Sequence, residues 1–435
     1  MKTTPAANAT PSSSAPTPEG RARAFMDELA QGAWDHPKTA FDDAVTAALP
    51  PEKVHAVWGQ IVGGAGAYQS IEGVVTEKKG NADAVAVTCK FANANILVRL
   101  AFVDGKLAGL FFSPAPSPAS AWTAPGYAKP GTFDERAVSV GASPALPGIL
   151  SMPKGAAPVP AIVLVHGSGP NDEDESILGN KVFKDLAWGL ASRGIAVLRY
   201  KKRTLVDPTG VTTQKSEVDD GATAAVTLLG HTAGIDPARV YLLGHSQGGY
   251  LAPRIARENP SLAGIVILAG SARPLEDSIV DQMRYFATLN PSNPQNQAAI
   301  DDALKSKAAI EDPGLRPDQD LTVLGATIKG SYFLDVRGYD PAAVAHSLSL
   351  GILVLQGERD YQVTMQDFRG WRATLAGKKN ATLKAYPLLN HLFIRGEGPP
   401  SPAEYQVAGH VDEQVIADIA AWIQTNRVSP ASPVR

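Results

Sequence analysis

The chain has little cysteine, little net charge and no long apolar run, and each shortage excludes a class of protein. Cys89 is the single cysteine among 435 residues, so an intramolecular disulfide framework and a thiolate metal cluster are excluded. The formal net charge of -3 gives no electrostatic basis for binding nucleic acid or an anionic membrane. No run of about 18 apolar residues occurs, so we expect no membrane span. With 44% hydrophobic and 19% charged residues, the composition is typical of a soluble globular protein.

Proline and apolar periodicity divide the chain into parts, and its length exceeds that of one ordinary hydrophobic core. Residues 1–20 are rich in Pro, Ser, Thr and Ala, which predicts a disordered tail. Such a tail often follows a removed export signal, so the location stays open between exported (periplasmic or extracellular) and cytoplasmic. Residues 21–113 change from helical to alternating apolar spacing, which predicts a small α+β domain. The Pro-rich residues 114–132 are expected to be an extended linker.

Strands and helices alternate over residues 133–430. Short apolar runs occur at 136–140, 147–151, 160–165, 195–200, 239–244, 264–269, 351–356 and 381–386. Amphipathic segments lie at about 179–193, 214–230, 247–257, 364–375 and 412–425. This alternation predicts an α/β fold with a mostly parallel sheet and helices on both faces. Residues 271–348 have polar, proline-broken helical segments and no comparable strand, so we expect a helical cap insertion.

The segment VYLLGHSQGGYLAPRIA, residues 240–256, places one serine between two glycines where an apolar run becomes helical. A serine in the strained turn of a G-x-S-x-G motif has positive φ, and side chains two residues to either side would collide there. Gly244 and Gly248 relieve that crowding. Ser246 is therefore the candidate nucleophile, and the alternative is a structural serine in a turn.

A serine hydroxyl needs a base, and the base needs an orienting carboxylate, in the chain order Ser, acid, His. Asp360 lies in the turn after the apolar run of GILVLQGERDYQV, and Glu358 is the alternative acid. His391 follows the last apolar run in ATLKAYPLLNHLF and is the candidate base. His245, next to the serine, is expected to pack beneath the turn. We expect His410 to begin or support the final helix.

The tetrahedral intermediate needs backbone N–H donors aimed at its oxyanion. One candidate is Gln247, at the start of the helix after the serine. The other lies in VLVHGSGP, where we favour Ser168 and keep Gly167 as the alternative. Gly169 lets the backbone approach a substrate, and His166 either orients this loop or is a satisfied buried histidine. No pair of histidines has metal-ligand spacing with a third ligand nearby, so we expect no metal.

Two charged segments are expected to meet at the rim of this site. NDEDES, residues 171–176, follows the glycine-rich loop, and YKKR, residues 200–203, follows the next apolar run. Our main interpretation is that salt bridges between them fix the oxyanion loop, with Arg203 as a testable member. Recognition of a charged substrate is the alternative.

Several motifs together resemble the bacterial dienelactone-hydrolase-like serine esterases of the α/β-hydrolase superfamily. They are VLVHGSGPNDEDES, FKDLAWGLASRGIAVLRYKKRT, VYLLGHSQGGYLAPRIA, LQGERDYQV and YPLLNHLF, spread over about 150 to 428. The resemblance implies hydrolysis of carboxylic esters through an acyl-enzyme, with the three residues proposed above as the triad. Family members commonly read Tyr-Asp-Lys-Arg where this chain has Lys201 in place of the aspartate.

The first domain resembles the small cystatin-like (nuclear-transport-factor-like) domain of unknown function that precedes such esterases. That resemblance implies an accessory module or a homodimer contact. For the whole chain we expect a carboxylesterase acting on small, short-acyl-chain esters without a cofactor. The alternatives are a serine peptidase, a thioesterase or acyl transferase, and a non-catalytic binding protein.

Overall fold

The computed structural model describes residues 17–33, 41–48, 50–79, 81–92, 94–115, 122–155 and 158–426. The chain divides into two compact units, Met1–Ser120 and Ala121–Arg435, and each is described here by itself. Residues 1–16 of the predicted tail lie outside the described residues, whereas Pro18 already begins a helix. None of the described helices has the length and apolar character needed to span a membrane.

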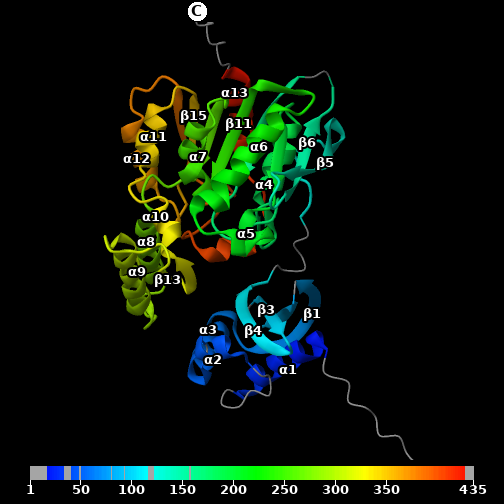
Figure 1. Ribbon diagram of the computed structural model, residues 1–435, viewed down its shortest axis with the longest axis vertical. Helices are drawn as coiled ribbons and strands as arrows, with labels where there is room; N and C mark the ends of the chain where they lie inside the picture. The colour runs from blue at the N-terminus through cyan, green and yellow to red at the C-terminus, as the bar shows by residue number, and fades with distance from the viewer. Residues whose placement is uncertain are drawn as a thin grey trace, which may run out of the picture. The chain divides into compact units, whose positions relative to one another are not determined.

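The first unit is an antiparallel sheet with helices on its inner face (Figure 1). The helices are α1 (Pro18–Gln31), α2 (Asp43–Ala48) and α3 (Pro51–Ala65), and the strands, in sheet order, are β1 (Tyr68–Lys79), β2 (Ala82–Phe91), β3 (Asn95–Val103) and β4 (Lys106–Pro114). Alternation along β2 buries Val85, Val87, Cys89 and Phe91 against α1 and α3. Cys89 is fully buried, so burial raises the pKa of its thiol to about 12.

Parts of the predicted linker, residues 114–132, belong to the two folded units. Its first residue, Pro114, ends β4, and residues 116–121 lie outside the described part. Beyond them, the Trp122 indole donates a hydrogen bond to Asp185 Oδ1 at 2.8 Å, and the Tyr127 hydroxyl donates to the Val411 carbonyl at 2.8 Å. These aromatic side chains therefore attach the second half of the segment to the larger unit.

The larger unit contains a mixed sheet of eight strands (Figure 1). In sheet order these are β16 (Ala381–Tyr386), β15 (Gly351–Gly357), β12 (Gly264–Leu268), β11 (Ile235–His245), β7 (Val159–Val165), β10 (Ala196–Tyr200), β6 (Leu146–Pro153) and β5 (Phe133–Val140). The six strands from β16 to β10 are parallel, and β6 and β5 are added antiparallel. Six of the eight predicted apolar runs lie within these strands, and the runs 195–200 and 264–269 each extend one residue beyond their strand.

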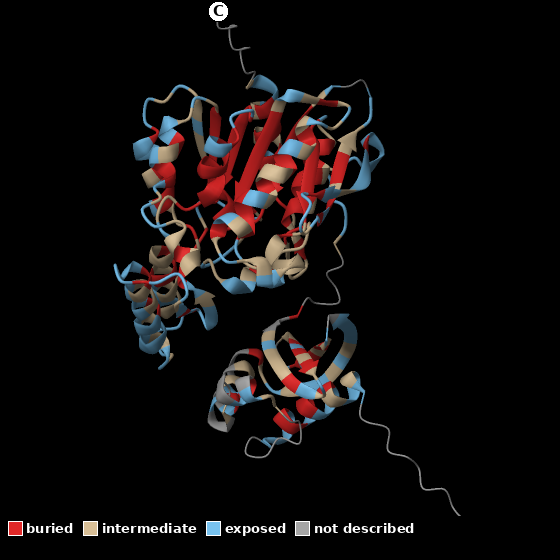
Figure 2. Cartoon of the chain, viewed as in Figure 1, coloured by how far each residue is buried: buried red, intermediate tan, exposed pale blue. Residues whose placement is uncertain are grey.

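Helices cover both faces of the sheet, and Figure 2 shows that its central strands are buried. Apolar residues of these strands belong to two cores, one on each face. Along β7, Ala161, Val163 and Val165 face one core, and Ile162 and Leu164 face the other. The first core includes α6 (Asp220–Gly230), α7 (Gln247–Glu258), α11 (Pro341–Ser347) and α12 (Met365–Thr374); the second includes α4 (Val182–Ala191) and α13 (Glu413–Thr425). Shorter elements are η1 (Pro130–Thr132), β8 (Ser176–Ile177), β9 (Asn180–Lys181), α5 (Arg203–Val206), η2 (Pro208–Gly210), the π-helical η3 (Lys215–Asp219) and η4 (Pro402–Gln406).

The cap differs from the helical insertion expected over residues 271–348. It contains α8 (Leu275–Leu289), α9 (Asn296–Glu311) and α10 (Gly330–Leu334), but also a hairpin of β13 (Asp320–Val323) and β14 (Ala326–Lys329). Leu324 and Gly325, both at positive φ, form its two-residue turn. The cap has a separate apolar core around Ile279, Ile310 and Phe333. By contrast, α11 packs into the main core, so the cap ends before it.

Candidate active site

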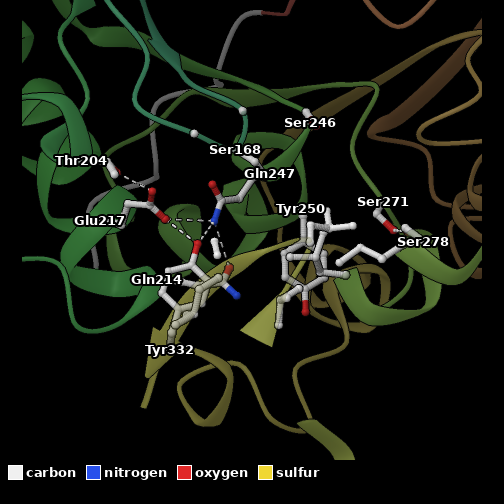
Figure 3. Close-up of a pocket in the computed structure, with 18 of the residues that line it drawn as sticks. Ser168, Thr204, Gln214, Glu217, Ser246, Gln247, Tyr250, Ser271, Ser278 and Tyr332 are labelled. Carbon is white, nitrogen blue, oxygen red and sulfur yellow. Dashed lines mark hydrogen bonds between the residues drawn. The ribbon is translucent and has the colours of Figure 1, made fainter. Parts of the chain in front are cut away.

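Ser246 occupies the turn between β11 and α7, where the chain reverses from strand to helix. Its φ of 51° and ψ of -114° are strained for a residue with a side chain. A Cβ on Gly244 would collide with the Gly248 carbonyl, and one on Gly248 would collide with the Val165 carbonyl. The Ser246 N–H donates to the Leu268 carbonyl at 3.0 Å, which ties the turn to the next strand. The two glycines therefore make this turn possible, and the serine is held at the edge of a pocket (Figure 3).

His391 and Asp360 are brought together by the turns that follow β16 and β15. The His391 Nδ1 lies 2.7 Å from Asp360 Oδ2, and both side chains are almost completely buried. Asp360 Oδ1 accepts the N–H groups of Gln362 and Val363 at 2.8 and 2.9 Å. Gln356 Nε2 donates to Asp360 Oδ2 at 3.1 Å. These donors orient the carboxylate toward the imidazole, whereas the alternative acid, Glu358, is exposed.

Ser246 and His391 line one pocket. Among the described residues, no hydrogen bond joins the serine hydroxyl to the imidazole. Hydrogen bonds of this kind often form only when a substrate is bound. The arrangement supplies a hydroxyl, an imidazole and a buried carboxylate in the order that acyl transfer needs.

His245 lies beneath the serine turn, as expected, but it is not a plain packing residue. Its Nδ1 lies 2.9 Å from Glu175 Oε2, and its Nε2 lies 3.0 Å from the His391 carbonyl oxygen. Burial lowers the pKa of His245, but the neighbouring Glu175 carboxylate outweighs it and the net direction is upward. Glu175, with φ of 47°, also accepts the Gly167 N–H at 2.6 Å. The buried Glu175–His245 pair thus connects the loop of Gly167 and Ser168, called the oxyanion loop below, to the backbone of the loop that carries His391.

The three backbone N–H groups proposed as oxyanion donors differ in whether they already donate a hydrogen bond within the protein. The Gly167 N–H is occupied by Glu175, which weighs against the alternative donor. Neither the Ser168 N–H nor the Gln247 N–H donates to another group in the described part of the chain. Gln247 is the first residue of α7, where backbone N–H groups have no partner within the helix. Gly169 has φ of 96°, which suits a glycine next to this loop.

The remaining sequence candidates support neighbouring structure. His166 is buried between the rings of Phe183 and Tyr200, and its Nε2 lies 3.0 Å from the Asp172 carbonyl. Burial lowers the pKa of His166 to about 4, so this histidine is neutral and ties down the acidic loop. His410 Nδ1 lies 3.1 Å from Asp185 Oδ1, away from the serine.

The charged rim is assembled differently from the expectation. Asp174 of the acidic segment 171–176 forms a salt bridge at 2.8 Å with Arg199. Arg199 is the residue immediately before the YKKR segment. Arg203 instead pairs with Asp207 at 3.3 Å. Lys202 contacts the oxyanion loop through the Gly167 carbonyl at 2.7 Å rather than through an acidic side chain of 171–176. In sequence, charge alone did not distinguish the buried Arg199 and Lys202 from the half-buried Lys201 and Arg203.

The pocket has a volume of about 700 Å³ and is lined by the serine turn, the oxyanion loop and the cap (Figure 3). Its apolar walls include Val211, Leu275, Ile279, Val323, Ile328 and Phe333. Its polar lining includes Gln214 and Glu217, which the sequence reasoning missed, together with Tyr332 and with Glu175 of the acidic segment 171–176. Of the aromatic cap residues, Tyr332 and Phe333 line this pocket. No group of side chains suited to a metal ion occurs among the described residues.

Both parts of the chain are similar to known proteins. Residues 162–420 match the model of the alpha/beta hydrolase family, and residues 22–110 match a family described as a protein of unknown function, DUF3887. Esterase EstD of Thermotoga maritima is 39% identical over 404 residues, 92% of this chain and 93% of that protein. Est1E from Butyrivibrio proteoclasticus covers 67% of this chain and 98% of its own, with 17% identity and a TM-score of 0.44. A Klebsiella pneumoniae protein assigned as a dienelactone hydrolase gives 16% identity, coverage of 67% and 99%, and a TM-score of 0.41.

The chain belongs to the alpha/beta hydrolase family. The family match and the identity to EstD over nearly the whole of both chains support an enzyme of the carboxylesterase type. The resemblance to this superfamily drawn from the sequence motifs is confirmed.

Proposed function

We propose that this protein hydrolyses carboxylic esters by a Ser246, His391 and Asp360 triad through an acyl-enzyme. The observation that carries the proposal is the 2.7 Å contact between His391 and Asp360 beside the strained serine turn of one pocket. The hydrolase family and the esterase EstD supply the reaction class. A catalytic base held by a buried carboxylate is what a serine hydroxyl needs to become a nucleophile.

In the proposed first half-reaction, His391 Nε2 takes the proton of the Ser246 hydroxyl while Oγ bonds to the ester carbonyl carbon. The carbonyl electron pair moves onto the oxygen. This oxyanion accepts hydrogen bonds from the backbone N–H groups of Ser168 and Gln247. Collapse of this intermediate breaks the bond to the alcohol, which leaves with the proton from His391. Water then repeats the sequence on the acyl-enzyme and releases the acid. Each step balances with the serine, the histidine and water.

The expectation from the sequence is a small ester with a short acyl chain. We keep the short acyl chain in the proposal and replace the small alcohol by a bulky apolar alcohol group, because of the size of the cavity. A cavity of about 700 Å³ is in the range that larger organic ligands occupy, roughly 300 to 1,000 Å³. A short acyl chain would leave much of that volume to the other side of the ester. The apolar residues from α8 and the β13–β14 hairpin favour a hydrophobic group there.

The test is hydrolysis of two ester series by the wild type, Ser246→Ala and Ser278→Ala. One series lengthens the acyl chain from acetate to laurate, and the other enlarges the alcohol of an acetate from ethyl to naphthyl. Ser246→Ala is expected to lower kcat by about 10⁴-fold or more, whereas Ser278→Ala, a serine in the same pocket, retains turnover. A coenzyme A thioester and an aminoacyl anilide are assayed in parallel. Faster cleavage of either compound than of any ester would overturn the ester proposal.

A further inference from the structure

Lys202 is a buried cation beside the proposed oxyanion hole. It lies in the turn after β10, and its side chain is 2% exposed. Its ammonium group donates to the Gly167 carbonyl at 2.7 Å and to Gln247 Oε1 at 2.8 Å, and it pairs with Glu217 Oε1 at 3.1 Å. A lysine has three N–H donors, so these three partners use its full capacity. Two of the three partners belong to the segments that supply the proposed oxyanion donors.

The contact with Gly167 determines where the Ser168 N–H points. In a planar trans peptide, the carbonyl of one residue and the N–H of the next point in opposite directions. Lys202 Nζ and Asn171 Nδ2, the latter at 3.0 Å, both hold the Gly167 carbonyl. The N–H on the other side of the same peptide belongs to Ser168. Fixing the carbonyl on the Lys202 side therefore turns the Ser168 N–H to the opposite side.

The contact with Gln247 fixes the second donor residue. Lys202 Nζ donates to the side-chain oxygen of Gln247. Nε2 of Gln247 donates to the Tyr332 hydroxyl at 2.6 Å and to Glu217 Oε2 at 3.2 Å (Figure 3). Glu217 also accepts the Thr204 and Tyr332 hydroxyls, both at 2.5 Å. These contacts bridge three elements, because Tyr332 comes from the cap, Glu217 from η3 and Gln247 from the start of α7.

Lys202 and Glu217 are the cation and the anion of this network, and each affects the pKa of the other. Burial raises the pKa of Glu217, but Lys202 and the two hydroxyl donors outweigh it, so the net direction is downward. Burial lowers the pKa of Lys202, and Glu217 opposes that change. Removing the lysine alone would leave a buried carboxylate without its cation, which is strongly destabilising. A test of Lys202 therefore has to treat Glu217 at the same time.

We propose that Lys202 is a positioning residue of the oxyanion hole, which through one ammonium group orients the Ser168 N–H and anchors Gln247. The proposal rests on the proposed esterase function. A donor that acts mainly on the developing oxyanion changes kcat more than KM. Among the described residues, Lys202 is not one of those that line the pocket, and its ammonium group forms no hydrogen bond with the serine, so its effect passes through the two backbone donors.

The experiment compares Lys202→Met, the double variant Lys202→Met with Glu217→Gln, and Lys201→Met in the full-length protein. Lys201 is the matched control, because it adjoins Lys202 and its side chain forms no ion pair or hydrogen bond among the described residues. We expect both Lys202 variants to lower kcat by about 10- to 100-fold with KM changed less than about threefold. Lys201→Met is expected to equal the wild type. The double variant leaves neither charge of the Lys202–Glu217 pair unpaired. Its kcat therefore tests the proposal even if the single variant does not fold.

A second readout separates positioning from loss of structure. A trifluoromethyl ketone with the acyl group of the best substrate forms a hemiketal oxyanion on Ser246, so its Ki reports the oxyanion hole directly. We expect its Ki to rise by the same factor as kcat/KM falls, while Ki for the product alcohol, which has no carbonyl oxygen for the oxyanion hole, stays unchanged. Folding is checked by thermal unfolding. A folded double variant with wild-type kcat and ketone affinity would overturn the proposal for Lys202, whereas a wild type no more active than Ser246→Ala overturns the esterase function itself.

Discussion

The two sides of the candidate active site are built in different ways. On the acid and base side, Asp360 and His391 follow neighbouring strands, and a single 2.7 Å contact joins them. On the oxyanion side, the proposed donors are held by Lys202, Glu217 and Tyr332, which come from three separate segments. Strand order is enough to bring the first pair together. The second arrangement needs buried polar side chains that satisfy one another, so a change in any member affects the others.

The acid and base side should show the largest effect of a single change. Asp360→Asn removes the carboxylate that orients His391 Nδ1, so the imidazole is held in the wrong tautomer. We expect kcat for a short ester to fall by about 10³- to 10⁴-fold, measured by steady-state kinetics. The matched control is Glu358→Gln, which neutralises an exposed carboxylate two residues earlier and should leave kcat unchanged. Equal losses in the two variants would contradict the assignment of the acid.

The buried pair beneath the serine should show a loss of stability that depends on pH. The raised pKa of His245 gives stability that is present below its usual value of 6.5 and is lost as pH rises through the raised pKa. Burial raises the pKa of Glu175 and the His245 contact more than reverses this, so its contribution is present above 4.5 and is lost only at more acidic pH. Glu175→Gln should therefore lower the free energy of unfolding by about 3 kcal/mol near pH 6, and by less above the raised pKa.

Denaturant unfolding at several pH values measures this difference. Glu173→Gln serves as the control, because Glu173 lies in the same loop and forms no ion pair with a described residue. If the loss in Glu175→Gln were constant from pH 5 to 9, or matched that of the control, the ion pair would not be the cause.

The contact between the cap and the oxyanion side should give a smaller effect. Tyr332→Phe removes the hydroxyl that accepts from Gln247 and donates to Glu217. We expect kcat to fall about five- to tenfold and the free energy of unfolding by about 1 to 2 kcal/mol, measured by kinetics and denaturant unfolding. Tyr285→Phe is the matched control in α8, since its hydroxyl donates to Pro400 outside this network. If Tyr332→Phe were as active as that control, the contact between the cap and the oxyanion side would not contribute to turnover.

The smallest effect is expected at the rim of the site. Arg203→Ala breaks only a partly exposed pair with Asp207, so the free energy of unfolding should change by less than about 1 kcal/mol and turnover should not change. Arg199→Met removes a buried arginine that is bonded to Asp174 and Glu135, and should cost about 3 kcal/mol or more. Thermal unfolding and kinetics compare the two. If Arg203→Ala lowered the free energy of unfolding more than Arg199→Met, the salt-bridged rim with Arg203 that was expected from the sequence would be supported instead.

The sequence by itself determined the fold class and proposed the residues of the triad. Eight apolar runs correspond to the eight strands of the sheet, because a buried parallel strand needs apolar side chains on both faces. The serine turn was readable because only glycine fits at Gly244 and Gly248. The β13–β14 hairpin was missed because each strand has four residues and packs only within the cap.

Only the tertiary structure decided which charged residues are buried and what they hold. Lys201 and Lys202 are adjacent and chemically identical, yet only Lys202 extends between the oxyanion loop and α7. Glu175 and Tyr332 likewise meet partners 70 and 85 residues away in sequence. No local pattern encodes such pairs, because their stability depends on burial and on partners that the folded chain brings together.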